Sequence, residues 1–560
     1  MDKLSIFWLG MVKKHLLALC ILLGLGLFAM KTFWGPNYFD GHDAQAHLVR
    51  LYQYDLALKD GQFPPRWAGG LLAGRGYPVF IFAYPLPYLI AEGFHLVGFT
   101  LAVAIKLTFV LSYLVSIIGM YFFGLTCWQS KKAGFLTALL WSWAPPIFEK
   151  IFIGGALGEI VAFTFIPWTF LALFKLFKQP NLKNSFYLAL SLTLWSLSHL
   201  LNPIIFSPLL LIFSFFRLSQ AENKILSLKF LFLSGFITLG LTAWFIVPAA
   251  LEIKFTHFNE FVINQYSSQF VSLKRLLYSK WGTDAPGWGN NPVSQQVGVA
   301  QWLAIGMTAG LAILKPSRSV LEGKAWPFLL SFAISIFLML SISKPIWDLS
   351  TPLQNVSTPW RFLSLAVFSA AMAGGYVVKK IEKNKLLEFT ACLLLIVLAI
   401  YGNRNHLRIN DIRNYDLSFL QNYTGVATGW NEHLPIWVKD TPHEFPQNKL
   451  EVLSGDCQID YPAVKCLTYS TLQLNTAYYP GWQVKVDNQI TPIYPTDDGL
   501  ISFSVASGNH QIESKFTDTP LRRNSKIISF VTLFFIVIYY SRHCFDYVLQ
   551  VFFTHVRIKR

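Results

Sequence analysis

The feature that most constrains the fold is the recurrence of long apolar stretches between residues 15 and 541. A helix needs about 20 mostly apolar residues to cross a bilayer, and it satisfies its own backbone hydrogen bonds there. Charged residues make up only 14% of the chain, against about 25% in an average soluble domain. The sequence therefore predicts an all-α polytopic membrane protein.

Basic residues give the predicted orientation, because cytoplasmic loops are enriched in Lys and Arg. With this guide we assign about twelve spans and place both termini inside, so that nearly every inner loop is basic. The spans are 15–34, 101–127, 133–149, 156–175, 185–201, 203–218, 230–251, 298–314, 325–343, 360–378, 386–402 and 525–541. The first apolar stretch lacks a small-residue cleavage site, so we expect a retained first helix.

The segment 78–98 is apolar enough to span, but Pro85 and Pro87 interrupt it. Counting it as a span would also put Lys131 and Lys132 outside. We therefore expect a juxtamembrane helix on the outer face, within a first outer loop over 35–100.

The formal net charge of +16 does not predict nucleic-acid binding. The Lys and Arg residues fall in short loops between apolar spans, which is the pattern of the positive-inside rule. We therefore expect the bilayer, and no nucleic acid, among the partners.

The chain divides into a transmembrane domain (1–402), a soluble segment (403–524) and a last helix with a basic tail (525–560). Within the soluble segment, residues 448–517 alternate apolar and polar side chains between Gly, Pro, Asn and Asp turns. This pattern predicts a small antiparallel β-domain on the outer face. Cys457 and Cys466 lie close together there, which favours a local disulfide.

The first outer loop concentrates charge next to the first span. Its acidic, histidine and arginine residues include Asp40, His42, Asp43, His47, Arg50 and Arg66. A charge at the bilayer centre costs about 2.5–3.5 kcal/mol or more, so this cluster must lie at the interface or line a wet cavity. Asp43 and His47 would share a helix face, with Arg50 three residues further on.

A carboxylate beside an imidazole and a guanidinium suits base-assisted attack on a phosphate-activated sugar. The carboxylate takes the proton of the acceptor hydroxyl, and the cation stabilises the leaving phosphate. The alternative is structural: Asp40 or Asp43 caps the helix that begins near Ala44.

Three further polar residues lie at predicted outer ends of spans. Glu159 is a second acid or a partner for Arg361, or else a capping or interfacial residue. His199 faces the same site or makes an interhelical hydrogen bond. Arg361 is a phosphate ligand or an anchor beside Trp360.

The run from Gly41 to Leu89, with GHD, a following His and Arg, GQFPPRW, GYPVF and PLPYL, resembles the membrane proteins labelled 6-pyruvoyl-tetrahydropterin synthase-related. Looser matches are GGALGEIVAF, LSHLLNP, the loop 281–298 and TPWRFL. The stretch YYPGWQVKVDNQ and the strands after it resemble the tail domain of YfhO-type membrane proteins. The pterin chemistry in the label finds no support, because the chain has no His-x-His motif.

These families are similar to the GT-C superfamily of glycosyltransferases. The resemblance implies a polyprenyl-phosphate sugar donor, an envelope glycan or lipid acceptor, and Asp40 or Asp43 as base in the first outer loop. His47 joins the catalytic set, and the substrate contacts are His42, Arg50, Arg66, Glu159, His199 and Arg361. The implied location is the bacterial inner membrane, with the soluble segment outside as an acceptor-docking or lid module.

One alternative function and one question about a metal ion stay open. A lipid-linked glycan transporter or assembly scaffold would use the same charges to bind phosphate without cleaving it. No cofactor is required, although Asp40, Asp43 and Glu159 are ligand types that a divalent metal ion prefers.

Overall fold

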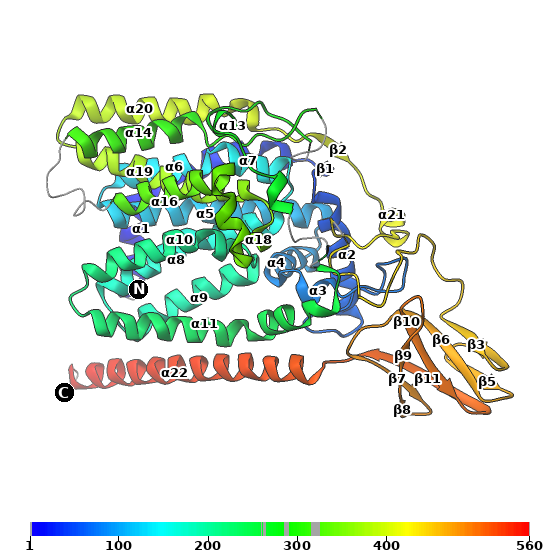
Figure 1. Cartoon of the computed structure of the whole chain (residues 1–560). Helices are drawn as coiled ribbons and strands as arrows, with labels where there is room; N and C mark the ends of the chain where they lie inside the picture. The colour runs from blue at the N-terminus through cyan, green and yellow to red at the C-terminus, as the bar shows by residue number, and fades with distance from the viewer. Residues whose placement is uncertain are drawn as a thin grey trace.

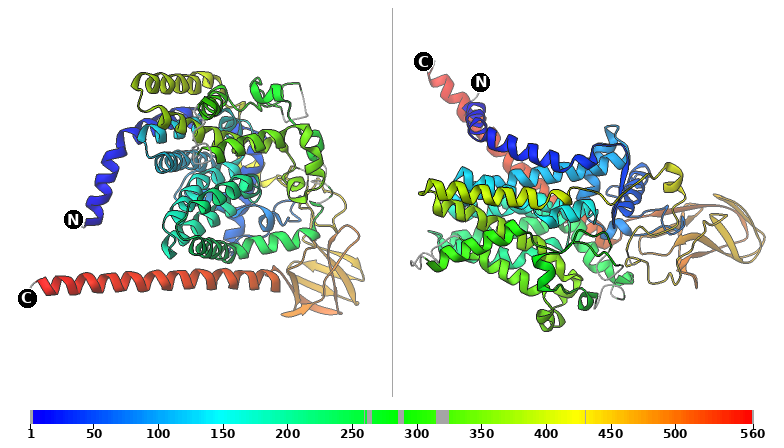
Figure 2. Two further views of the ribbon diagram at one scale, coloured as in Figure 1. Left: turned by 60° about the vertical axis from the view of Figure 1, so that its left-hand side comes forward. Right: turned by 90° about the horizontal axis from the view of Figure 1, so that it is seen from above.

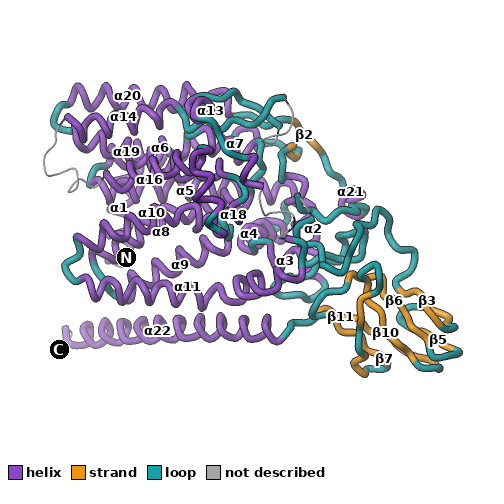
Figure 3. Tube along the Cα trace, in the orientation of Figure 1, coloured by secondary structure: helices purple, strands orange, loops and turns teal. Residues whose placement is uncertain are grey.

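The computed structural model describes residues 3–258, 260, 265–284, 290–314, 325–429 and 431–558, with side chains from residue 15 to residue 539 and at 541. Long helices lie side by side in one bundle, and a β-domain projects from one end of it (Figure 1). The first outer loop lies at that same end, between the bundle and the β-domain. Helices, strands and connecting loops are separated by colour in Figure 3.

Each predicted span overlaps a helix, and the span 133–149 overlaps two. The helices that carry them are α1 (Lys3–Ala29), α5 (Leu101–Trp128), α6 (Lys131–Ser142), α7 (Pro145–Phe152), α8 (Leu157–Lys178), α9 (Leu182–Ser198), α10 (Asn202–Ser219), α11 (Lys224–Glu252), α14 (Val299–Leu314), α16 (Trp326–Met339), α19 (Leu363–Ile381), α20 (Lys385–Gly402) and α22 (Pro520–Ile558). The helices outside the predicted spans are α2 (Ala44–Lys59), α3 (Val79–Phe82), α4 (Pro85–Leu96), α13 (Leu273–Leu277), α17 (Lys344–Asp348), α18 (Thr351–Val356) and α21 (Leu417–Gln421).

Within the described residues, six helices are long and apolar enough to cross a membrane: α5, α8, α10, α11, α19 and α20. A seventh span results if α16 and the segment Ser341–Asp348, which bend by 88°, are counted together. Helix α9 has 17 residues, and His15–Ala29 and Val299–Ile313 are shorter apolar helices. The chain is thus a helical membrane protein, while the count of about twelve spans stays a prediction.

Prolines break two of the predicted segments. The span 133–149 divides into α6 and α7, because Pro145 and Pro146 begin a new helix after an extended Ala144. The juxtamembrane segment 78–98 is not one helix: α3 ends at Phe82, and Pro85 begins α4. Both breaks occur at the end of the bundle that carries the first outer loop (Figure 1).

The core of the bundle forms where α5 packs against α6 and α8, and α19 packs against α6. Large rings fill this interior, and Trp141 and Phe368 meet edge to face with centroids 5.7 Å apart. The helices of the core are apolar on most faces, as expected for helices enclosed by other helices in a membrane.

The β-domain contains two antiparallel sheets. Their strands are β3 (Leu450–Ser454), β4 (Cys457–Asp460), β5 (Ala463–Cys466), β6 (Ser470–Ala477), β7 (Trp482–Val486), β8 (Gln489–Thr491), β9 (Tyr494–Pro495), β10 (Leu500–Val505) and β11 (Gly508–Phe516). One sheet has the order β3-β6-β10-β9 and the other β4-β5-β11-β7-β8. Leu472, Leu474, Ile501 and Phe503 fill the core between them. The predicted β-rich region is confirmed, although residues 465–475 form two strands rather than one.

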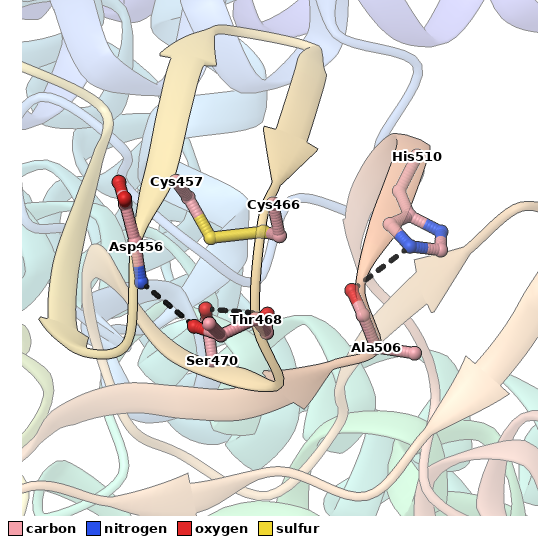
Figure 4. Close-up of a disulfide and its surroundings, with 7 residues drawn as sticks. All are labelled: Asp456, Cys457, Cys466, Thr468, Ser470, Ala506 and His510. Carbon is pink, nitrogen blue, oxygen red and sulfur yellow. Dashed lines mark hydrogen bonds between the residues drawn. A yellow bond between two sulfur atoms is a disulfide. The ribbon is translucent and has the colours of Figure 1, made fainter.

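The disulfide expected from the sequence joins Cys457 of β4 to Cys466 of β5, which face each other in register (Figure 4). Close by, the Asp456 amide donates to the Thr468 hydroxyl, and the Ser470 hydroxyl donates to the Thr468 carbonyl. The disulfide therefore ties a hairpin at the edge of its sheet.

Residues 403–449 do not belong to the two sheets. They run back over the first outer loop, where β2 (Asp411–Arg413) pairs with β1 (Tyr38–Asp40). Further along, the amides of Leu72 and Ala73 donate to the carbonyls of Gly425 and Thr424. The soluble segment therefore consists of a cover over the first outer loop, followed by the β-domain.

A buried ion pair joins the β-domain and α22 to the bundle. The Arg522 guanidinium donates to both carboxylate oxygens of Glu252, at 2.7–3.0 Å. The Arg522 side chain is 0% exposed and that of Glu252 is 3% exposed. Figure 2 shows the long helix α22 running beside the bundle from this junction.

Candidate functional site

The GHD segment of the first outer loop is held by backbone contacts with the turn between α7 and α8. The amides of His42 and Asp43 donate to the carbonyls of Ile153 and Gly154, both at 2.9 Å. Gly155 has a φ of +61°, and a Cβ there would come within 3.0 Å of the Ala44 amide nitrogen. Glycine at this position therefore allows α2 to begin against the α7–α8 turn.

Asp43 occupies the N-cap position of α2, but its side chain accepts no capping hydrogen bond. Asp43 therefore has the position of a helix-capping residue but does not make the capping hydrogen bond. Asp43 is solvent-exposed, and among the described residues no ion-pair partner lies within 4 Å of it. Its carboxylate is thus accessible and unbonded.

The groups around Asp43 nevertheless shift the pKa of its carboxyl. Although solvent reaches the Asp43 side chain, the protein packed around its carboxyl desolvates it and raises its pKa above the ordinary value, and the nearby Arg50 and His42 partly offset this rise. Arg361 and Glu159 also lie near enough to act on it electrostatically. The structure therefore brings residues from the first outer loop, α8 and the turn before α19 to one place.

Asp40 differs from Asp43. It pairs with Arg413 across β1 and β2, with 3.5 Å between Arg413 Nε and Asp40 Oδ1. Its negative charge is therefore already balanced by Arg413.

Glu159 is also neutralised. Lys150 of α7 places Nζ 2.5 Å from Glu159 Oε2, and Arg361 places Nε 3.5 Å from Glu159 Oε1. The side chains of Lys150 and Glu159 are 3% and 7% exposed. The expected partnership of Glu159 with Arg361 is present, and Lys150 is an additional partner.

Sequence reasoning did not single out Lys150. The available signal was a lysine at the end of an apolar segment, where an unpaired charge is costly. Its amine also lies 5.2 Å from the ring centroid of Trp360, which adds a cation–π contact.

His47 and Arg50 converge on a tyrosine of α4. The ring Nδ1 of His47 lies 2.7 Å from the Tyr88 hydroxyl, and Arg50 donates to the same oxygen at 3.3 Å. Arg50 Nε also donates to the Ala427 carbonyl at 2.7 Å, so the cover segment fixes this guanidinium. Burial lowers the pKa of His47 well below its ordinary value, so its imidazole is neutral near pH 7.

His199, at the end of α9, lies beside these groups. Its ring centroid is 5.3 Å from that of Tyr84, and its buried Nδ1 has no hydrogen-bond partner. Glu159, Arg361 and Lys150 are close enough to act on it electrostatically. Its placement agrees with the expectation that it faces the same site.

Two other predicted residues are placed differently. His42 turns its Nε2 toward the Thr283 carbonyl at 2.8 Å and stays exposed. Arg66 is not in this cluster: it donates to the Trp244 carbonyl of α11 at 2.7 Å. We call the set that does come together the acid–base cluster: Asp43, His47, Arg50, Tyr88, Lys150, Glu159, His199 and Arg361.

Across the described part of the chain, no three His, Cys, Asp or Glu residues are arranged to hold a metal ion. In particular, Asp40, Asp43 and Glu159 do not form such a group. The cations beside Asp43 and Glu159 are instead suited to binding an anion.

The sequence model of the 6-pyruvoyl-tetrahydropterin synthase-related domain, described as a membrane protein, matches residues 81–411. The chain therefore belongs to this family of membrane proteins. A relative from Lactococcus lactis subsp. cremoris, an uncharacterised protein, is 24% identical over 274 residues. That alignment covers 47% of this chain and 44% of the relative, so the chain spans less than half of the relative's length.

Among solved structures, the chain is similar to the mycobacterial arabinofuranosyltransferase AftD, with a TM-score of 0.47 and 13% identity. The match covers 71% of this chain and 28% of AftD. A mutant of the same enzyme gives a TM-score of 0.46 at 14% identity, with the same shares covered.

Proposed function

We propose that this protein is a membrane glycosyltransferase that moves a sugar from a polyprenyl-phosphate donor to a hydroxyl group of an envelope glycan or lipid. The single observation that carries the proposal is the state of Asp43. It is an accessible carboxylate with no ion-pair partner among the described residues, next to fixed cations, while Asp40 and Glu159 are both paired.

In the proposed reaction, Asp43 accepts the proton of the acceptor hydroxyl. The hydroxyl oxygen then forms a bond to the anomeric carbon of the donor sugar. The bond between that carbon and the phosphate oxygen breaks, and its electron pair leaves with the polyprenyl phosphate. A positioned general base of this kind contributes about 10²–10⁴-fold to a rate.

The cations would stabilise the leaving phosphate. Arg361 donates through Nη1 to the Val356 carbonyl at 2.7 Å and to the Ser357 hydroxyl at 3.4 Å. Its buried Nε makes no hydrogen bond, although it lies 3.5 Å from Glu159 Oε1. Arg50 is oriented by Ala427 and Tyr88. Because these guanidiniums are held before a ligand arrives, little ordering would remain to be done on binding.

The protein would lie in a bacterial inner membrane with about twelve spans and with its β-domain on the outer face. The acceptor would then approach from the side of the β-domain and of the cover, which is formed by residues 403–449. Arg50 contacts that cover directly, so movement of the cover and position of the guanidinium are linked.

A donor turnover assay tests the proposal. Purified protein in nanodiscs is given a panel of polyprenyl-phosphate sugars together with an envelope extract as acceptor, and the release of polyprenyl phosphate is followed. We expect consumption of one donor. If no donor is consumed although one is bound, the protein is a lipid-linked glycan transporter or scaffold, and the transferase proposal is wrong.

A further inference from the structure

A second polar site lies away from the acid–base cluster, where the first outer loop, the β-domain and the start of α22 meet. It is a pocket of about 470 Å³. Its charged lining consists of five basic and two acidic residues: Arg66, Arg75, Lys449, Lys515, Lys526, Asp60 and Asp518. The excess of positive charge favours an anionic ligand.

Arg66 is the residue in this pocket that most needs a ligand. It is 3% exposed, and Nη2 donates to the Trp244 carbonyl at 2.7 Å. Its Nε and Nη1 are buried and have no hydrogen-bond partner. A buried donor left without an acceptor is destabilising, and more so when it is charged. A phosphate would accept from such a guanidinium through charge-assisted hydrogen bonds.

An apolar groove of about 290 Å³ continues from the pocket along the bundle. Most of its walls are apolar side chains of α4, α9, α11 and α22: Pro85, Leu86, Leu89, Leu197, Leu241, Trp244, Phe530 and Leu533. The groove and the pocket share Phe63, Pro64 and Lys526. It runs between helices that are placed side by side in Figures 1 and 2.

Arg66 lines the pocket beside the groove. Its guanidinium carbon lies 5.4 Å from the ring centroid of Trp244, which lines the groove. On the other side, Lys526 pairs with Asp518 at 2.6 Å and lines both spaces. A buried cation at the mouth of an apolar groove matches a molecule with a phosphate head and a long apolar chain.

We propose that this site holds one anionic glycerophospholipid, with its phosphate on Arg66 and Lys526 and an acyl chain along the groove. This inference goes beyond the proposed function, because it needs no catalysis. The lipid would contact the first outer loop, the β-domain and α22 together, and so would fasten the β-domain to the bundle.

The position of the pocket argues against the sugar donor as its occupant. Helix α2 has 16 residues and is therefore about 24 Å long. Asp43 lies at its first end, whereas Asp60 and Gly61, which follow its last residue, line the pocket. A phosphate bound there would be too far from Asp43 for transfer.

Native mass spectrometry of the full-length protein tests the proposal. Delipidated protein is titrated with phosphatidylglycerol, phosphatidylcholine or undecaprenyl phosphate. We expect one phosphatidylglycerol to bind with a Kd about tenfold below that of phosphatidylcholine. Charge-assisted hydrogen bonds contribute about 1.5–3 kcal/mol, so Arg66→Gln should raise the phosphatidylglycerol Kd about tenfold or more.

Two further variants and a control distinguish binding of the lipid phosphate from packing of its acyl chain. Lys526→Gln removes the half-buried cation, and Leu533→Trp fills the groove without changing charge; both should weaken phosphatidylglycerol binding. Lys465→Gln, at an exposed position of β5, removes the same charge outside the pocket and should leave the Kd unchanged. Thermal unfolding checks that each variant is folded. If Arg66→Gln does not fold, Lys526→Gln and Leu533→Trp still test the proposal.

Three results would overturn the proposal: equal affinity for phosphatidylcholine, affinities that the three variants leave unchanged, or stronger binding of undecaprenyl phosphate that depends on Arg66. The last result would assign the site to the donor lipid instead. Donor turnover is measured in a separate assay, so failure of this proposal and failure of the proposed function can be distinguished.

Discussion

Asp43 and Asp40 lie three residues apart, and their environments give them different expected roles. The Asp40 carboxylate is paired with Arg413 at a partly exposed position, and such pairs contribute about 0–1 kcal/mol. We expect Asp40→Asn to change turnover by less than about threefold, measured as initial rates beside the wild type. A loss comparable to that of Asp43→Asn would move the base to Asp40.

The pH dependence of turnover should carry the signature of Asp43. A general base works when it is deprotonated, so activity is present above its pKa and falls as the pH drops through it. Because desolvation by the surrounding protein raises the pKa of Asp43, this acid limb should lie above the range of an ordinary aspartate. The measurement is the pH profile of kcat/KM, with donor stability checked at each pH. An acid limb at or below the ordinary aspartate pKa would exclude Asp43 as the base.

Glu159 should matter for stability as much as for activity. Removing one member of a buried ion pair leaves an uncompensated charge and costs about 3–5 kcal/mol. We expect Glu159→Gln to lower the unfolding temperature clearly, since Lys150 stays buried. Adding Lys150→Met should restore part of the loss, and thermal unfolding of both variants measures this. Equal unfolding temperatures for the single and double variants would show that the pair is not coupled.

Single residues also show where sequence reasoning stops. The segment that holds Asp43, His47 and Arg50 was predictable, because charge next to an apolar span must lie at an interface. The choice between Asp40 and Asp43 was not, because Arg413 lies far away in the chain and reaches Asp40 only through the pairing of β1 with β2. Arg66 was expected among the substrate contacts and lies instead beside Trp244, on α11.

Among the helices, the joint between α11 and α22 makes a prediction of its own. Arg522 and Glu252 form a buried, bidentate pair at the base of the β-domain. Arg522→Met should leave Glu252 charged and unpaired, and should expose the connection near Thr517 to protease. The neighbouring Arg523→Met is the matched control, because Arg523 is exposed. Equal rates of limited proteolysis in the two variants would contradict this role.

Helix positions followed from hydropathy, because an apolar stretch in a membrane has few alternatives to a helix. Helix breaks were harder to place. Pro145 and Pro85 each begin a new helix, so one predicted span and the juxtamembrane segment are both divided. In the β-domain, the run 465–475 reads as one alternating strand, yet a turn at Leu467–Tyr469 separates β5 from β6. The alternation of side chains does not reveal a strand that changes sheets.

For the molecule as a whole, the predicted topology places Lys183 inside and Asp498 outside. The test is labelling of single cysteines by a membrane-impermeant maleimide in intact cells, in a background where four cysteines are replaced by serine: Cys20, Cys127, Cys392 and Cys544. We expect Asp498→Cys to be labelled and Lys183→Cys to be labelled only after permeabilisation. Labelling of both in intact cells, or the reverse pattern, would contradict the orientation.

The arrangement of the whole molecule depends on contacts that no local pattern contains. The sequence groups residues 403–449 with the β-strands only as one soluble segment. In the structure they form a cover along the first outer loop, where the Ala427 carbonyl accepts from Arg50. The sequence of this segment has little hydrophobic periodicity, so its composition predicts only that it lies outside the membrane spans.

The most direct test of the central proposal compares donor binding and turnover in Asp43→Asn. This substitution keeps the size of the side chain and removes the base. With the donor found in the turnover assay, we expect the Kd to stay within about threefold of the wild type while kcat falls about 10²–10⁴-fold. A variant that binds the donor and retains wild-type turnover would contradict the assignment of Asp43 as the catalytic base.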